Sequence, residues 1–252
     1  MYALYKRRRD YLSFPISREK QLEWPTGCVR IARFPRVHGA IDCIHVALRA
    51  PQNDPEIFHN HKGFHSFHVQ LVCDHNRTII AVDAWYPGSS HNAFILRQTN
   101  VPGDFARQNQ DCGWLLGNKG YPLCTWLLTL LRHPRTTAQQ SYNDSHSRTR
   151  CIIEQTIGIL KKRFHCLDRS GGALQYSPQQ VSLFVAVCCV LHNLAIMKAQ
   201  PLEDEAAVLP EEEDQEHDTQ EEEEEKEAQK EDQDAGRRPR RRHRHLDLQG
   251  KC

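Results

Sequence analysis

Two acidic residues of this sequence lie where a carboxylate is expected to have a functional role. Asp42 lies inside the apolar stretch His38–Leu48, and burying a carboxylate in such a strand is costly unless a partner pairs with it. Glu154 lies beside the apolar stripe of a long helical segment, with Arg150 and Lys161 on roughly the same face. A carboxylate flanked by bases suits a metal that holds a phosphate. The alternative interpretation of Glu154 is a surface ion pair on an amphipathic helix.

The elements that must position these residues alternate between strands and helices. In the most regular helix Ile153, Ile157, Leu160 and Phe164 recur every three or four residues, which predicts a one-sided apolar face. Three strands followed by helix, strand and helices indicate a mixed α/β layer fold. The expected strands are 38–48, 67–73, 78–85 and 114–116, with a hairpin turn at 74–77, and the expected helices are 89–96, 122–131, 145–167 and 178–197.

Charge divides the chain into regions of opposite sign. Residues 1–201 carry a net charge of +11, residues 202–236 carry −16 and residues 237–252 carry +6, so the total of +1 arises by cancellation. A basic body favours a polyanionic partner such as a nucleic acid. The expected domains are an N-terminal remnant over 1–36, a catalytic domain over 37–198, a disordered acidic segment over 202–236 and a basic tail over 237–252 of the nuclear-localisation type.

Several classes of protein are disfavoured. No run of 18 apolar residues exists, so a membrane span is not expected, and the N-terminus lacks the apolar core of a signal peptide. The ten cysteines lie scattered in apolar contexts, which favours reduced intracellular thiols over a disulfide framework. The absence of any C-x-x-C motif removes the strongest zinc signature.

Seven short motifs, in order from Phe34 to Ile196, resemble the transposase-derived nuclease family of the Harbinger (PIF) superfamily, a group of DDE transposases. Each motif is modest alone, but seven in one order are highly specific. They are Gly39 to Val46, Lys62 to Ser66, Val72 to Asp74, Pro87 to Asn92, Gly117 to Leu123 with Tyr142-Asn143, Arg150 to Glu154 with Arg163-Phe164, and Cys188 to Asn193.

This resemblance implies a ribonuclease H-like fold, a mixed sheet flanked by helices. It also implies catalytic positions at Asp42, Asn118 and Glu154, with a further metal position at Asn92. In such enzymes two divalent ions, Mg²⁺ or Mn²⁺, activate water and stabilise the leaving oxygen of a phosphodiester. The implied function is metal-dependent hydrolysis of DNA, with no small-molecule cofactor.

The sequence departs from the family pattern at two of these positions. Asn118 and Asn92 stand where acids are expected, and an amide brings no charge and bridges two cations less well. The alternative is therefore a catalytically impaired domesticated domain that binds DNA or a protein. Stand-in acids are Asp83, Asp74 and Asp111. Asp83 is the best of them, although a hairpin-strand charge is the simpler interpretation, and Asp74 is expected to shape its turn.

The resemblance also implies partners and a compartment. They are DNA, a separate Myb-like DNA-binding protein, and the nucleus, with the cytoplasm as a further location. A region resembling a helix-turn-helix precedes the catalytic domain in full-length relatives, whereas only some 36 residues precede it here.

Three other groups of residues carry weaker signals. His59, His61, His65 and His68 could gather a transition metal, but they overlap the family's Lys-Gly-x-x-Ser loop. Cys188 and His192 share one face of an apolar helix, which favours core packing over metal binding. Lys161, Lys162 and Arg163 could contact phosphate, and a solvated helix face explains them equally well.

Overall fold

The structure is a computed structural model that describes residues 1–14, 34–108 and 113–200. The expectations for the acidic segment 202–236, the basic tail 237–252 and Asp111 lie outside these described residues. Within them the elements centre on one sheet of five strands, in the order β3-β2-β1-β4-β5. The strands are β1 (Val37–Ala47), β2 (Ser66–Cys73), β3 (Ile79–Pro87), β4 (Trp114–Leu116) and β5 (Leu127–Leu128).

Pairing in the sheet is mixed, and β1 lies at its centre. Strand β1 pairs with β2 and β2 with β3 in the antiparallel sense, whereas β1 with β4 and β4 with β5 are parallel. The α/β class with a mixed sheet flanked by helices is therefore confirmed. Likeness to ribonuclease H beyond this arrangement stays a prediction.

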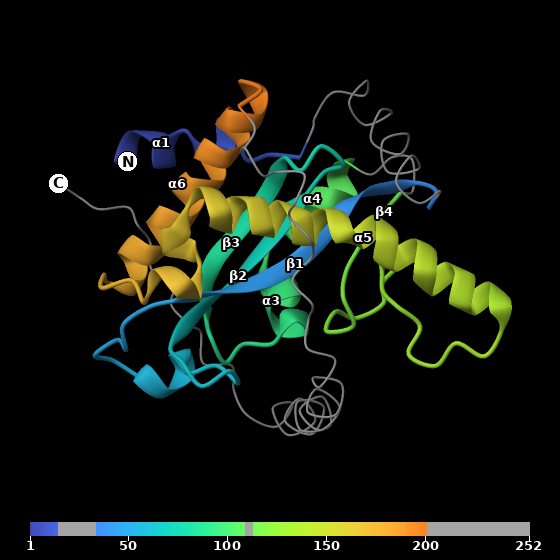
Figure 1. Cartoon of the computed structure of the whole chain (residues 1–252), viewed down its shortest axis with the longest axis horizontal. Helices are drawn as coiled ribbons and strands as arrows, with labels where there is room; N and C mark the ends of the chain where they lie inside the picture. The colour runs from blue at the N-terminus through green and yellow to red at the C-terminus, as the bar shows by residue number, and fades with distance from the viewer. Residues whose placement is uncertain (15–33, 109–112, 201–252) are drawn as a thin grey trace. The chain divides into compact units, whose positions relative to one another are not determined.

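Helices cover both faces of the sheet (Figure 1). The long helices α5 (Thr137–Arg163) and α6 (Pro178–Met197) lie on one face, and α3 (Asn92–Gln98) and α4 (Val101–Gln108) lie on the other. The remaining elements are α1 (Tyr2–Lys6) and the short 3₁₀ turns η1 (Arg8–Asp10), η2 (Pro55–Phe58), η3 (His165–Leu167) and η4 (Arg169–Gly171).

The alternation of side chains along β1 divides the core into two parts. Ala40, Ile44 and Val46 point toward α5 and α6, whereas Ile41 and Cys43 point toward α3 and α4. The apolar stripe that the sequence shows on α5 is buried in the first of these two parts. Asp42 shares the α5 side of the strand, so its carboxylate faces the helix that carries Glu154.

Three details differ from the sequence-based expectation. The helix expected over 122–131 is wrong, because Leu127 and Leu128 pair with β4 as a short parallel strand, and a short apolar run does not distinguish helix from strand. Helix α5 begins eight residues earlier than expected, where Thr136 and Gln139 form a reciprocal capping box. Helix α4 was not expected.

Helix α6 is long and apolar enough to cross a membrane by length and composition, with a mean hydropathy of 1.9. In the fold 56% of that stretch is buried, and the helix packs against β3, α1 and α5. We therefore interpret α6 as a core helix that packs on the same face of the sheet as α5.

Candidate active site

Asp42 lies at the middle of the central strand, opposite Leu71 of β2. Its Oδ1 atom accepts a hydrogen bond of 2.8 Å from the backbone N–H of Cys43. The side chain is almost fully buried, so every remaining oxygen lone pair needs a partner within the protein. The next contacts supply those partners from two distant segments.

Asn118 reaches Asp42 because it follows β4, the parallel neighbour of β1. The register pairs Ala40 with Leu116, so two residues further along each strand Asp42 and Asn118 lie level with one another. The Nδ2 atom of Asn118 donates to Oδ1 of Asp42 at 3.0 Å. Its Oδ1 atom accepts a 3.0 Å bond from the backbone N–H of Gly120, which fixes the orientation of the amide.

Asn92 is the first residue of α3, and it completes a chain of side-chain contacts. Its Nδ2 atom donates to Oδ1 of Asn118 at 3.3 Å. Gly120 packs closely against this pair, since a Cβ there would lie 3.1 Å from Nδ2 of Asn92 and 3.2 Å from Oδ1 of Asn118. The tight turn after β4 therefore holds the Asn118 amide against the carboxylate of Asp42, and Asn92 contacts the other side of that amide.

Arg150 joins Glu154 to the same cluster. Its Nη1 atom lies 3.0 Å from Oδ2 of Asp42, and its Nη2 atom lies 2.5 Å from Oε1 of Glu154. The exposed fractions of the three side chains are 10% for Arg150, 5% for Asp42 and 18% for Glu154. The i,i+4 pair that helical spacing predicts for Arg150 and Glu154 is present, but it is buried at the sheet rather than on the surface. The link from Arg150 to Asp42 had no signal in the sequence.

A second pair of polar groups lies behind Asp42 on the opposite face of β1. The Sγ atom of Cys43 lies 3.1 Å from the hydroxyl oxygen of Tyr121. Burial raises the pKa of the Cys43 thiol well above its usual value, and burial together with the neighbouring Cys43 does the same for the Tyr121 phenol. Both groups are therefore neutral at physiological pH, and neither is an activated nucleophile.

Comparison with known proteins shows the family of this chain. The family described as DDE superfamily endonuclease matches residues 41–193, more than half of the chain and all four candidate positions. The chain belongs to this family. The resemblance to Harbinger transposase-derived nucleases is thereby confirmed.

Curated relatives of this DDE endonuclease family member come from animals and plants. The chain is 37% identical over 216 residues to "Putative nuclease HARBI1" of Homo sapiens, covering 84% of this chain and 62% of the relative. It is 32% identical to the Xenopus laevis protein of the same name, with the same coverage, and 25% identical to "Protein ALP1-like" of Arabidopsis thaliana, covering 81% and 53%. The chain thus spans about three fifths of the length of the HARBI1 relatives. No solved structure matches.

The donor set of this DDE family member does not fit a site for two divalent ions. Only Asp42 and Glu154 are acids, and both already share the guanidinium of Arg150. Asn118 turns its N–H toward Asp42, whereas a metal needs its oxygen there. Within residues 1–14, 34–108 and 113–200, no three His, Cys, Asp or Glu side chains are grouped so that they could hold a metal ion.

Neither Asp83 nor Asp74, the two stand-in acids among the described residues, repairs this deficit. In the strand register Asp83 lies opposite Gln70, and Gln70 lies opposite Cys43, so Asp83 is on the other face of the sheet from Asp42. Asp74 accepts backbone N–H bonds from Asn76 and Thr78 at 2.8 and 2.9 Å, as expected for a residue that shapes its turn.

The weaker groups of residues have structural partners. The His45 and His68 rings stack with centroids 4.2 Å apart, and the Nδ1 atom of His68 lies 2.6 Å from the carbonyl oxygen of Ser90. On α6, His192 is buried with Nε2 3.0 Å from the carbonyl oxygen of Arg77, which is a core role. At the end of α5, Lys161 lies 3.9 Å from Asp168.

Proposed function

We propose that this chain is a DNA-binding domain of the DDE endonuclease family in which hydrolysis has been lost. One observation carries the proposal: the guanidinium of Arg150 forms ion pairs with both remaining acids, Asp42 and Glu154. The two acids that would bind divalent cations in the family's chemistry are thus paired with a positive charge of the chain itself.

The balance of charge supports this reading of the site. Acids at positions 92 and 118 would give the cluster four carboxylates against one guanidinium, a net charge of −3. The actual residues give two carboxylates against one guanidinium, a net charge of −1. Two Mg²⁺ ions bring four positive charges, so a cluster of −1 compensates them far less well.

The basic charge of the body supports DNA as the partner. Residues 1–201 carry a net charge of +11, and such an excess releases counterions when it meets the phosphate backbone. The family match supports the same partner class. We also propose a nuclear location, with a Myb-like protein as the source of sequence-specific recognition.

Cleavage and binding assays on one protein preparation test the proposal. We expect the full chain to bind duplex DNA with an affinity that falls steeply with salt, and to leave the DNA intact in Mg²⁺ and in Mn²⁺. Cleavage that disappears in Glu154→Gln would overturn the loss of hydrolysis. Absence of binding at low salt would overturn the DNA-binding function.

A metal-dependent nuclease is the second candidate, and one observation favours it. The four family positions, although separated widely in sequence, are joined by one chain of contacts from Asn92 through Asn118, Asp42 and Arg150 to Glu154. If Arg150 withdrew when DNA and metal arrived together, Asp42 and Glu154 would be the acids left to hold the ion. The Glu154→Gln cleavage control separates this candidate from the first.

A further inference from the structure

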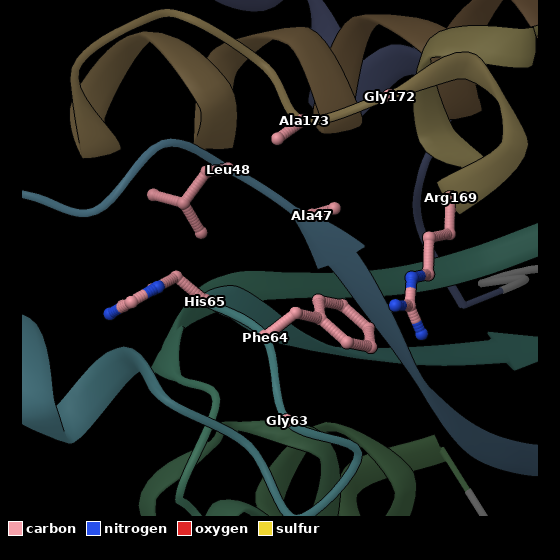
Figure 2. Close-up of a pocket in the computed structure, with 8 residues that line it drawn as sticks. All are labelled: Ala47, Leu48, Gly63, Phe64, His65, Arg169, Gly172 and Ala173. Carbon is pink, nitrogen blue, oxygen red and sulfur yellow. The ribbon is translucent and has the colours of Figure 1, made fainter.

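A pocket of about 410 Å³ lies where β1 leaves the sheet (Figure 2), within the usual size range of small-ligand sites. The segment after η4 is fixed along the end of β1, since Arg49 N–H donates to Leu174 O at 2.9 Å and Leu174 N–H donates to Ala47 O at 3.0 Å. The pocket lies between this segment and the loop before β2. Ala47 and Leu48 of the β1 end, Gly63 and Phe64 of that loop, and Arg169, Gly172 and Ala173 are among the residues that line it.

One cation stands over one aromatic ring in this pocket. The guanidinium carbon of Arg169 lies 4.4 Å from the centroid of the Phe64 ring, and Figure 2 shows the guanidinium pointing toward that ring. Among the described residues, no carboxylate lies within ion-pair distance of Arg169. A guanidinium that lies over a ring without a carboxylate partner has N–H groups that can make two parallel bonds to a phosphate.

The Phe64 ring is held in place before any ligand arrives. The backbone N–H of Phe64 donates to Oδ1 of Asn60 at 3.2 Å, and the Phe64 carbonyl oxygen accepts from the backbone N–H of Asn60 at 3.0 Å. The His45 ring packs against it edge-on at 6.3 Å. A ligand that packs against Phe64 and Arg169 therefore loses little affinity to ordering of the aromatic ring.

Glycine forms both rims of the pocket. Gly63 and Gly172 have φ angles of +79° and +86°, and a Cβ at either position would meet nothing within 4 Å. The backbone is therefore not covered by a side chain on either side of the opening. Between the rims, Leu48 and Ala173 supply an apolar wall. An apolar wall, an aromatic ring and one guanidinium suit a planar base that carries a phosphate.

We propose that this pocket takes one unpaired nucleotide of a DNA strand whose adjoining duplex lies on the Asp42 site. This inference rests on the proposed function. Ala47 follows Asp42 by five residues on β1, about 16 Å along the strand. That distance is about five steps of a DNA strand at 3.4 Å each. A paired base does not fit, because its ring faces are covered within the duplex, so the occupant is a single-stranded flank.

Binding of two DNAs by fluorescence anisotropy at fixed salt tests this inference. The first is a blunt duplex, and the second is the same duplex with a six-nucleotide single-stranded extension. Stacking of one base on an aromatic side chain contributes about 1–3 kcal/mol, so we expect the extension to tighten binding about tenfold. Phe64→Leu and Arg169→Gln should remove this advantage, with blunt-duplex affinity changed less than twofold.

Two further variants serve as controls. Phe64→Tyr keeps the ring and should keep the advantage. Arg135→Gln removes one charge just before α5, whose 27 residues span about 40 Å, and should also keep the advantage because it is far from Arg169. If Arg135→Gln and Arg169→Gln lost the affinity advantage of the extended DNA equally, the loss would be a general effect of charge, and the proposed nucleotide pocket would be overturned.

The remaining outcomes separate the pocket from the proposed function. Equal wild-type affinity for the two DNAs would overturn the pocket and leave DNA binding intact. Binding to neither DNA would overturn both. If dAMP raises the melting temperature of wild type but not of Phe64→Leu, and the extension gives no advantage, the pocket serves a free nucleotide and the strand proposal fails.

Discussion

The Nη1 atom of Arg150 lies 3.0 Å from Oδ2 of Asp42, a contact that spans 108 residues of sequence. It ties α5 to the central strand at a point where both side chains are nearly buried. Since Arg150 also pairs with Glu154, one guanidinium forms ion pairs with acids on two elements. The stability of the fold and the charge of the site therefore depend on the same residue.

Arg150→Met should lower the free energy of unfolding by about 3–5 kcal/mol, because it leaves two largely buried acids without their cation. Urea denaturation at neutral pH measures this loss. The same variant should show a larger Mn²⁺-induced rise in melting temperature than wild type, since Asp42 and Glu154 then need an external cation.

The matched control removes the acids together with the base. Asp42→Asn, Arg150→Met and Glu154→Gln combined should recover most of the stability that Arg150→Met loses, because a neutral set of similar volume leaves no unpaired charge. Wild-type stability in Arg150→Met alone would contradict the importance of the ion pairs.

Asn92→Asp combined with Asn118→Asp should restore two negative charges beside Asp42. Without metal, repulsion should make this double variant less stable than wild type. Mn²⁺ should reverse the loss, since a ligand at a hundredfold excess over its Kd stabilises the folded state by about 2.7 kcal/mol. Thermal melting with and without Mn²⁺ measures the effect, with exposed Asn53→Asp as the single-charge control. An equal shift in wild type and double variant would mean that the amides do not limit metal binding.

Asp83 should make stability depend on pH between about 4 and 7. Burial, with a smaller contribution from Asp104, raises its pKa to about 6, against an ordinary value of 3.8. The folded state then holds a proton that the unfolded state releases, so this residue costs stability as pH rises through that window. Asp83→Asn should be more stable than wild type at pH 7, by on the order of 2 kcal/mol, and equal to it near pH 4.

The difference between Asp83→Asn and wild type is the quantity to measure, by urea denaturation across pH. Burial lowers the pKa of His68 and of His146 to about 4, so these residues change stability in the opposite direction over the same range. Their contribution cancels in the difference. A difference that does not vary with pH would contradict the raised pKa of Asp83.

Asn193→Ala should destabilise the edge strand of the sheet. The Asn193 amide accepts from the N–H of Ile79 at 2.9 Å and donates to its carbonyl at 2.7 Å, in a buried setting. Each buried group left unpaired costs about 1–3 kcal/mol, so we expect a loss on the order of 3 kcal/mol in chemical denaturation. Asn143 makes the same two-way contact with Leu131 near the surface, so Asn143→Ala should lose much less. Equal losses would show that burial does not set the cost.

Local patterns predicted the elements best where periodicity was long. The repeated apolar spacing identified α5, and β-branched runs identified the three antiparallel strands. The segment 122–131 was mistaken for a helix because its apolar run is too short to show a period. The start of α5 was missed because the capping residue Thr136 precedes a polar first half of the helix, where no apolar stripe marks it.

The site was only partly predictable. Asp42, Asn92, Asn118 and Glu154 could be named from the family motifs, and the i,i+4 spacing pointed to the pair of Arg150 and Glu154. The contact between Arg150 and Asp42 depends on how α5 crosses the sheet, which no local pattern encodes. The separation of Asp83 from Asp42 follows from strand alternation, but only once the register of β2 and β3 is known.

The sheet order β3-β2-β1-β4-β5 has a consequence for the chain during its synthesis. Residues 37–87 form an antiparallel meander that can pair as soon as it is made, because all of its contacts are local. The face that receives α5 and α6 stays uncovered until residues 137–197 have followed. At about 5–20 residues per second, that interval lasts about 5 to 20 seconds, during which an apolar sheet face is open to chaperones and to aggregation.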